Sequence, residues 1–134
     1  MIALSLHEGR GPVLLRDVAK HEGISAKYLE QLAGSLRRAG LVQAARGPNG
    51  GYELARPADR ISAREILESV EGPTNLLNCL ISPSSCQRST ICAARRLWAK
   101  VDTEVSAILS ETTLADLRED QRMADAGDVP CYQI

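Results

Sequence analysis

Two short helical patterns joined by a glycine-containing turn constrain the fold of this chain most strongly. In the segment SAKYLEQLAGSLRRAG, apolar residues recur at i, i+3, i+4 and i+7, as they do on one face of a helix. Ser25 is a suitable N-cap for this helix, and Gly40 follows its last turn. The preceding pattern, LLRDVAKHEG, has helical spacing and ends at Gly23. Together they predict a helix-turn-helix unit.

A β-hairpin is predicted directly after the second helix. Val42 to Arg46 and Tyr52 to Ala55 are strand-like runs, and the GPNGG sequence between them supplies residues that adopt a positive φ. A hairpin in this position makes the unit a winged helix. The alternative is a helical pair in a bundle with solvated charges, and the hairpin favours the winged helix over it. We therefore predict a DNA-binding domain over residues 1–72.

A long helix is expected in the second half of the chain. Residues 73–91 are rich in Pro, Ser and Asn and predict a loop, and residues 92–117 predict a helix. Six apolar residues lie on one face of that helix: Leu97, Trp98, Val101, Val105, Ile108 and Leu109. Because so short a chain offers this face no partner, we expect a homodimer through the helix. Residues 118–134 are polar and acidic and predict a flexible tail.

The predicted fold is mainly α with a small β-hairpin: a winged helix-turn-helix plus a long C-terminal dimerisation helix. The net charge of −1 conceals a split between the two halves. Residues 1–60 carry nine Lys/Arg and six Asp/Glu, a balance of +3, whereas residues 61–134 carry seven and eleven, a balance of −4. No apolar run reaches the roughly 18 residues of a membrane span, and no cleavable leader is evident. We therefore expect a cytoplasmic protein without a membrane partner.

The second helix of the unit has polar side chains on the face away from its apolar stripe. In its first turns, Glu30 can accept a hydrogen bond from cytosine and Gln31 can pair with adenine. Arg46 stands at the hairpin turn, where an arm can enter a minor groove, although an ordinary surface arginine is the alternative. The predicted DNA-binding residues are Ser25, Lys27, Tyr28, Glu30, Gln31, Arg46 and Asn49.

Three cysteines occur within fourteen residues, at Cys79, Cys86 and Cys92. In a reducing compartment such thiols serve more often as metal ligands, redox sensors or small buried residues than as disulfides. Zinc favours C-x2-C pairs, which are absent, whereas wider spacing suits an iron–sulfur cluster. Cys131 lies in the predicted tail and is taken as unrelated. His7 and His21 are isolated and no phosphate loop or nucleophile motif occurs, so no catalytic residue and no enzyme activity are predicted.

These features in this order resemble the Rrf2 family of bacterial transcription regulators. The resemblance rests on residues 24–42 and 46–57, on the three cysteines and on TTLADL at 112–117. It implies a winged-helix homodimer on a palindromic operator, with the long helices crossed between subunits. Members with three such cysteines bind a [2Fe–2S] or [4Fe–4S] cluster and respond to iron, redox state or nitric oxide. Other branches lack the cysteines and regulate cysteine metabolism, sometimes with a partner enzyme. A small iron–sulfur electron carrier is the alternative outside the family.

Two departures from the family concern the fourth ligand. In the iron–sulfur biogenesis regulators a histidine follows the third cysteine by three residues, and Arg95 stands there in this chain. Family members also begin well before the point that matches Met1, so we expect a truncated N-terminal helix. In the nitric-oxide-sensing branch that helix supplies a carboxylate ligand from the other subunit. The fourth ligand is therefore left open between solvent, a thiol and a side chain upstream, and such a site can be empty in the isolated protein.

Overall fold

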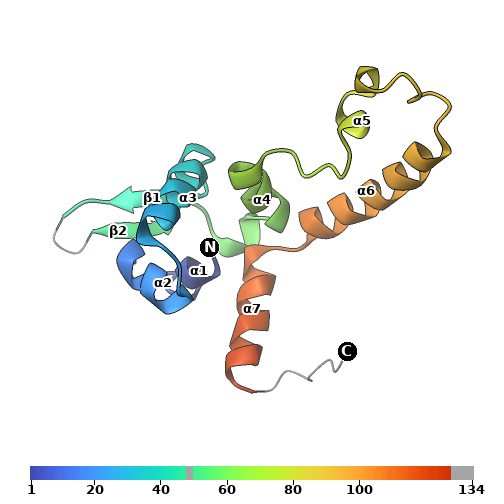
Figure 1. Ribbon diagram of the computed structural model, residues 1–134. Coiled ribbons are helices and arrows are strands. Elements are labelled where there is room, and N and C mark those ends of the chain that lie inside the picture. The colour runs from blue at the N-terminus through green and yellow to red at the C-terminus, as the bar shows by residue number, and fades with distance from the viewer. Residues whose placement is uncertain (48–49, 128–134) are drawn as a thin grey trace.

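The computed structural model describes residues 1–47 and 50–127, and it is mostly helical with one antiparallel hairpin (Figure 1). This agrees with the predicted fold class. The helices are α1 (Ile2–Leu6), α2 (Leu15–Glu22), α3 (Ala26–Arg38), α4 (Ala63–Glu71), α5 (Asn78–Ile81), α6 (Ala93–Glu111) and α7 (Leu114–Asp125). The hairpin strands are β1 (Val42–Ala45) and β2 (Gly51–Leu54), and the 3-10 turns are η1 (Ala58–Arg60) and η2 (Pro83–Ser85).

Local capping residues set the bounds of the helix-turn-helix. Gly23 ends α2 in the left-handed conformation at φ 66°, which a glycine adopts at no steric cost. The Ser25 hydroxyl oxygen then accepts a hydrogen bond from the Tyr28 N–H at 3.4 Å and caps α3. Ala33 and Leu36 form the buried side of α3, so the predicted apolar stripe faces the core.

The hairpin is shifted by one residue from its predicted bounds. β1 ends at Ala45 rather than Arg46, and β2 begins at Gly51, which pairs with Ala45. A third extended segment lies beside β2, where Val13 and Tyr52 exchange backbone hydrogen bonds of 2.8 Å each. This pairing joins the hairpin to the segment that enters α2, so the wing and the helix-turn-helix are one unit.

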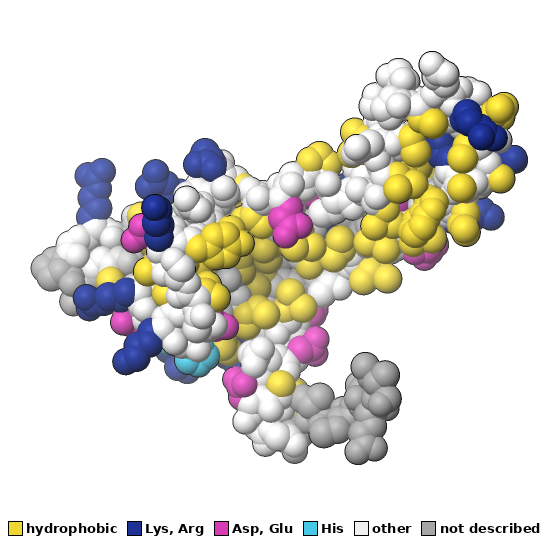
Figure 2. All heavy atoms as spheres, viewed as in Figure 1, with side chains coloured by type: hydrophobic (Ala, Val, Ile, Leu, Met, Phe, Trp, Pro, Cys, Tyr) yellow, Lys and Arg dark blue, Asp and Glu magenta, His cyan; other side chains and the backbone are white. Residues whose placement is uncertain are grey.

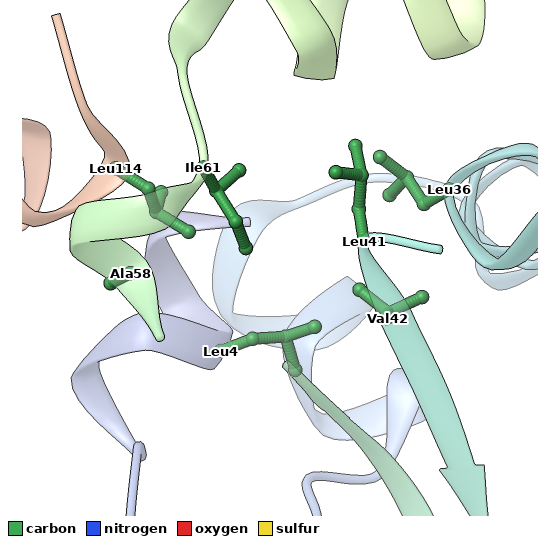
Figure 3. Close-up of a cluster of buried hydrophobic side chains, with 7 residues drawn as sticks. All are labelled: Leu4, Leu36, Leu41, Val42, Ala58, Ile61 and Leu114. Atoms are coloured by element: carbon green, nitrogen blue, oxygen red, sulfur yellow. The ribbon is translucent and has the colours of Figure 1, made fainter. Parts of the chain in front are cut away.

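The core lies where α1, α3, β1 and the η1 turn meet the start of α7 (Figure 3). Its buried side chains are Leu4, Leu36, Leu41, Val42, Ala58, Ile61 and Leu114. Ile61 and Leu114 are fully inaccessible to solvent. Since no Phe occurs in the chain, this core is built from aliphatic side chains, as expected.

The start of α4 and the start of α7 are fastened together. The Ala63 N–H donates to the Thr112 carbonyl, and the Leu114 N–H donates to the Ile61 carbonyl, each at 2.8 Å. Both helices begin with a capping box, Ser62 with Glu65 and Thr113 with Asp116. This junction fixes the end of α6 against the rest of the chain.

Two segments predicted to lack regular structure contain helices. The predicted loop at 73–91 holds α5 and η2, two turns of four and three residues that are too short for a periodic pattern. The predicted tail from residue 118 is helical to Asp125. Helix α7 packs against α1, where Arg118 bonds to the Glu8 carboxylate and the Ser5 carbonyl. A partner 110 residues away in the sequence therefore extends a helix that local composition does not predict.

Candidate nucleic-acid interface and cysteine segment

The polar face of α3 is accessible, as DNA recognition would require. Lys27, Tyr28, Glu30 and Gln31 are exposed, and the Tyr28 side chain is 54% accessible. Ser25 uses its oxygen as an acceptor in the helix cap, which leaves its hydroxyl proton able to donate to a phosphate. The sequence prediction thus picked out residues that lie together at one end of an exposed helix.

The wing is held by close backbone packing at one glycine. A Cβ atom at Gly51 would lie 2.5 Å from the Val13 carbonyl oxygen, a separation that real side chains do not tolerate. Arg46 is exposed and directly follows β1. Asn49, also predicted to contact DNA, lies outside the described residues. Val13 was not predicted as part of the wing, because its pairing with Tyr52 spans nearly 40 residues of sequence.

Basic side chains gather around this end of the molecule. Figure 2 shows Lys and Arg side chains over α3 and the hairpin, with a second group at the far end of α6. Helix α3 and the hairpin belong to residues 1–60, the part of the chain in which Lys and Arg outnumber Asp and Glu. A surface of this kind attracts a polyanion and neutralises phosphates.

The three cysteines are spread along one segment, residues 79–92, which we call the cysteine segment. Cys79 lies in α5, Cys86 follows η2, and Cys92 is the N-cap of α6. All three are free thiols and half-buried. Within residues 1–47 and 50–127, no three or more His, Cys, Asp or Glu side chains form a group that could hold a metal ion. Cys131 lies outside the described residues.

The donor set fits an iron–sulfur cluster in chemistry, with three thiols that reach solvent. The fourth position is not filled by Arg95, because a guanidinium stays protonated and offers no lone pair. Arg95 instead donates from Nε to the backbone carbonyl of Cys79 at 3.1 Å. Its role in the structure is to hold the cysteine segment against α6.

Asp102 makes a second attachment between α6 and the chain that leads into the cysteine segment. Its Oδ1 accepts from the Leu76 N–H at 2.9 Å, and its Oδ2 accepts from Asn75 Nδ2 at 3.0 Å. Sequence reasoning missed this carboxylate, since it lies 26 and 27 residues from its partners. Nothing in the sequence distinguished it from the other charged residues of this helix.

Helix α6 extends away from the core and leaves apolar side chains accessible (Figures 1 and 2). All of its 19 residues are described, and none is buried. Leu97 is 60% accessible and Ile108 is 62% accessible, with Trp98 and Val101 also exposed. Val105 and Leu109 of the predicted stripe are half-buried on the helix that α4 packs against.

Two carboxylates at the junction are held in their ionised form. The Glu65 carboxylate accepts hydrogen bonds from the Ser62 N–H at 2.9 Å and from the Arg56 guanidinium at 2.8 Å. Together these bonds lower the pKa of Glu65 below its ordinary value of 4.5. The Thr113 hydroxyl and N–H lower the pKa of Asp116 below 3.8 in the same way.

A family model for Rrf2, described as an iron-dependent transcriptional regulator, matches residues 1–120. The chain belongs to the Rrf2 family. The HTH-type transcriptional regulator IscR of Vibrio atlanticus is 35% identical over 128 residues, which cover 96% of this chain and 73% of that protein. IscR of Xenorhabdus nematophila is 36% identical over 128 residues, with coverage of 96% and 77%.

Solved structures of Rrf2 proteins share the fold. CymR, the global cysteine regulator of B. subtilis, superposes with a TM-score of 0.75 at 37% identity, covering 88% of this chain and 86% of that chain. IscR of T. potens has a TM-score of 0.75 at 35% identity, covering 92% and 80%. The predicted family is confirmed, and this Rrf2 protein is a DNA-binding transcriptional regulator rather than an enzyme. Among its described helices, none is long and apolar enough to cross a membrane.

Proposed function

We propose that this Rrf2 protein binds a palindromic operator as a homodimer, and that an iron–sulfur cluster on Cys79, Cys86 and Cys92 controls this binding. The observation that carries the proposal is the set of three half-buried free thiols on the segment between the DNA-binding part and α6. The iron-dependent description of the family and the IscR name of its relatives support it. Operator binding takes place in the cytoplasm.

The DNA-binding part of the proposal rests on exposed side chains. Lys27 and Tyr28 contact phosphates near the N-terminus of α3, while Glu30 and Gln31 read base edges in the major groove. Arg46 reaches an adjacent groove from the wing. Ser25 contributes its hydroxyl proton at the start of α3 and Asn49 acts from the hairpin turn.

The dimer part rests on the accessible apolar side of α6. A 19-residue helix with no buried residue gains little from the rest of its own chain. A second copy of the helix covers Leu97, Val101 and Ile108, and it sets two α3 helices at a fixed distance on the operator. The two half-sites of a palindrome then match the two-fold axis of the dimer.

Control of DNA binding requires a difference between two states of the cysteine segment. When bound, an iron–sulfur cluster supplies a group of iron and sulfide that reacts with oxidants and nitric oxide and is held by thiolates. The three cysteines then anchor α5, the end of η2 and the start of α6 to one object. A tenfold change in operator affinity between the two states needs about 1.4 kcal/mol. Both [2Fe–2S] and [4Fe–4S] clusters are compatible with three thiolates and one further ligand.

A second candidate is a cluster-independent regulator that acts with a partner enzyme. The similarity to CymR structures favours it, because that likeness equals the likeness to IscR. The two functions differ at the thiols, which only the first requires. An electron carrier has no support, since the relatives are transcriptional regulators.

The decisive experiment is anaerobic purification of the wild-type protein with iron supplied, followed by visible spectroscopy and analysis of iron and sulfide. We expect a coloured protein, and each of Cys79→Ala, Cys86→Ala and Cys92→Ala should lose the colour and the iron. Cys131→Ala is the matched control and should keep both. A wild-type protein that binds stoichiometric zinc and no iron would contradict the cluster and favour the second candidate.

A further inference from the structure

We propose that Asp102 and Arg95 form a polar clamp that holds Cys79 on α6 before any cluster binds. The clamp makes Cys79 and Cys92 a prearranged pair, and Cys86 is the thiol that is recruited last. The inference about cluster assembly rests on the proposed function, whereas the clamp itself is a property of the metal-free chain.

The two clamp residues form hydrogen bonds to neighbouring parts of one segment, residues 75–79. Asp102 accepts hydrogen bonds from the Leu76 N–H at 2.9 Å and from Asn75 Nδ2 at 3.0 Å. Arg95 donates to the Cys79 carbonyl at 3.1 Å, three residues further along. Because both carry a full charge, these hydrogen bonds are stronger than neutral ones. Residues 75–79 are thus attached to α6 at both ends.

The clamp residues share a face of α6. They are seven residues apart, which is about two helical turns, so their side chains point to the same side. Ala99 lies between them on this face and is half-buried, as are both clamp residues. Leu97, Val101 and Ile108 lie roughly 140° around the helix from that face. The clamp therefore leaves the accessible apolar side open for a second copy of α6.

Cys92 and Cys86 differ in how they are held. Cys92 is the N-cap of α6, so its backbone is already part of the helix that carries the clamp. Around Cys86, the hydrogen bonds that the described structure gives to residues 83–91 stay within residues 82–91. They are turn contacts such as Cys86 N–H to the Pro83 carbonyl at 3.4 Å. The backbones of Cys79 and Cys92 are therefore fixed to α6, and among the described contacts the backbone of Cys86 is held by local turns.

This arrangement assigns different roles to the three cysteines. A ligand that meets two prearranged thiols needs to order a shorter stretch of chain than one that must close the whole segment from 79 to 92. Figure 1 shows this stretch as an arc that leaves the α5 side and returns to the start of α6. When Cys86 also binds, residues 79–92 are held more closely together. Because this segment ends at Cys92, the change reaches the N-terminal end of α6.

The clamp can be tested in the reduced, metal-free, full-length protein by timed alkylation with iodoacetamide and peptide mass spectrometry. In the wild type, Cys86 should react faster than Cys79. Asp102→Ala should raise the rate at Cys79 about threefold to tenfold, close to the net effect of losing one ordinary hydrogen bond, because the site is only half-buried. Cys86 in the same sample should be unchanged and serves as an internal reference. Asp102→Asn keeps one acceptor oxygen and should restore part of the protection.

Glu104→Ala is the matched control, because it removes an exposed carboxylate from another side of α6 and should leave the Cys79 rate as in the wild type. Equal acceleration at all three cysteines in Asp102→Ala, or no acceleration at Cys79, would overturn the clamp. In a second arm, Asp102→Ala should take up less iron than the wild type at limiting iron, and Asp102→Asn should lie between them. If the wild type binds no iron, the proposed function fails while the alkylation result still decides the clamp.

Discussion

The proposed DNA-binding part of the chain, residues 1–72, and the arm that follows it are stabilised in different ways. Residues 1–72 share with α7 a core of seven buried apolar side chains that come from five elements and the connections between them. The arm, residues 73–111, is fully described and contains no buried residue. Within the arm, the Asp102 and Arg95 hydrogen bonds and the packing of α5 hold its first part against α6, and α4 packs on α6 from outside the arm. We infer that the first part folds by its own burial, while the arm depends on a second copy and on its thiol ligands for full order.

The largest expected effect comes from matched isoleucines in the two parts. Ile61 is fully buried at the junction, and Ile91 in the arm is 73% accessible. Ile61→Ala should lower the free energy of unfolding by roughly 2–5 kcal/mol, because it leaves a cavity in a packed core. Ile91→Ala should change it by less than about 0.5 kcal/mol in metal-free protein. Urea denaturation measures both free energies of unfolding, and similar losses for the two variants would contradict the difference in stabilisation between the two parts.

A charge on the open side of α6 should separate the subunits. Val101→Glu with Ile108→Glu should give monomers in sedimentation experiments at micromolar concentration, and operator affinity should fall about 100-fold, close to 2.7 kcal/mol. Ala107→Glu, exposed on another side of the same helix, is the control and should remain dimeric. If the double variant sediments like the wild type, α6 is not the dimer interface.

Replacing one exposed arginine in each part tests which part contacts DNA. Arg46→Ala at the wing should weaken operator affinity about threefold to tenfold and reduce the slope of log affinity against log salt by about one. Arg88→Ala removes an exposed cation from the cysteine segment and should leave the slope unchanged. Fluorescence anisotropy with an operator selected from randomised DNA measures both. Glu30→Ala should instead change which sequences are selected, because it tests base readout.

The smallest effect is the pH dependence of the junction. The pKa of Glu65 is lowered in the folded protein, so its contribution to stability is complete above its ordinary value of 4.5 and is lost as the pH falls through the folded value. Glu65→Gln should therefore cost a few tenths of a kcal/mol, roughly, near pH 6 and progressively less toward pH 3, since the site is partly exposed. Glu71→Gln, at the other end of α4, is the control. A loss that stays constant with pH would contradict this assignment.

Local signals in the sequence were enough to predict the helix-turn-helix within residues 1–72. Gly23 and Ser25 determine where α2 ends and α3 begins through their own backbone and side chain, so neighbouring residues carry all the information. The apolar spacing of α3 likewise identified its buried side. The bounds of the hairpin were wrong by one residue, and no local signal predicted that Val13, far away in the sequence, pairs with Tyr52.

The arm and α7 were less predictable because their contacts are long-range and polar. Asp102 finds its partners 26 and 27 residues away, and Arg118 finds Glu8 across 110 residues. No periodic pattern in the sequence predicts such pairs. The cysteines were identified from their spacing, but their distribution over α5, η2 and the start of α6 required the fold. Their role as cluster ligands stays a prediction.

In the proposed function, the state of the cysteine segment sets the affinity of residues 1–72 for the operator. The most direct test measures operator affinity on one anaerobic wild-type preparation, before and after iron is removed with a chelator, beside Cys131→Ala and Cys86→Ala treated identically. We expect the operator affinity to change tenfold or more, about 1.4 kcal/mol, in the wild type and in Cys131→Ala, and to stay unchanged in Cys86→Ala. Equal affinity of the iron-loaded and iron-free wild-type protein would contradict it.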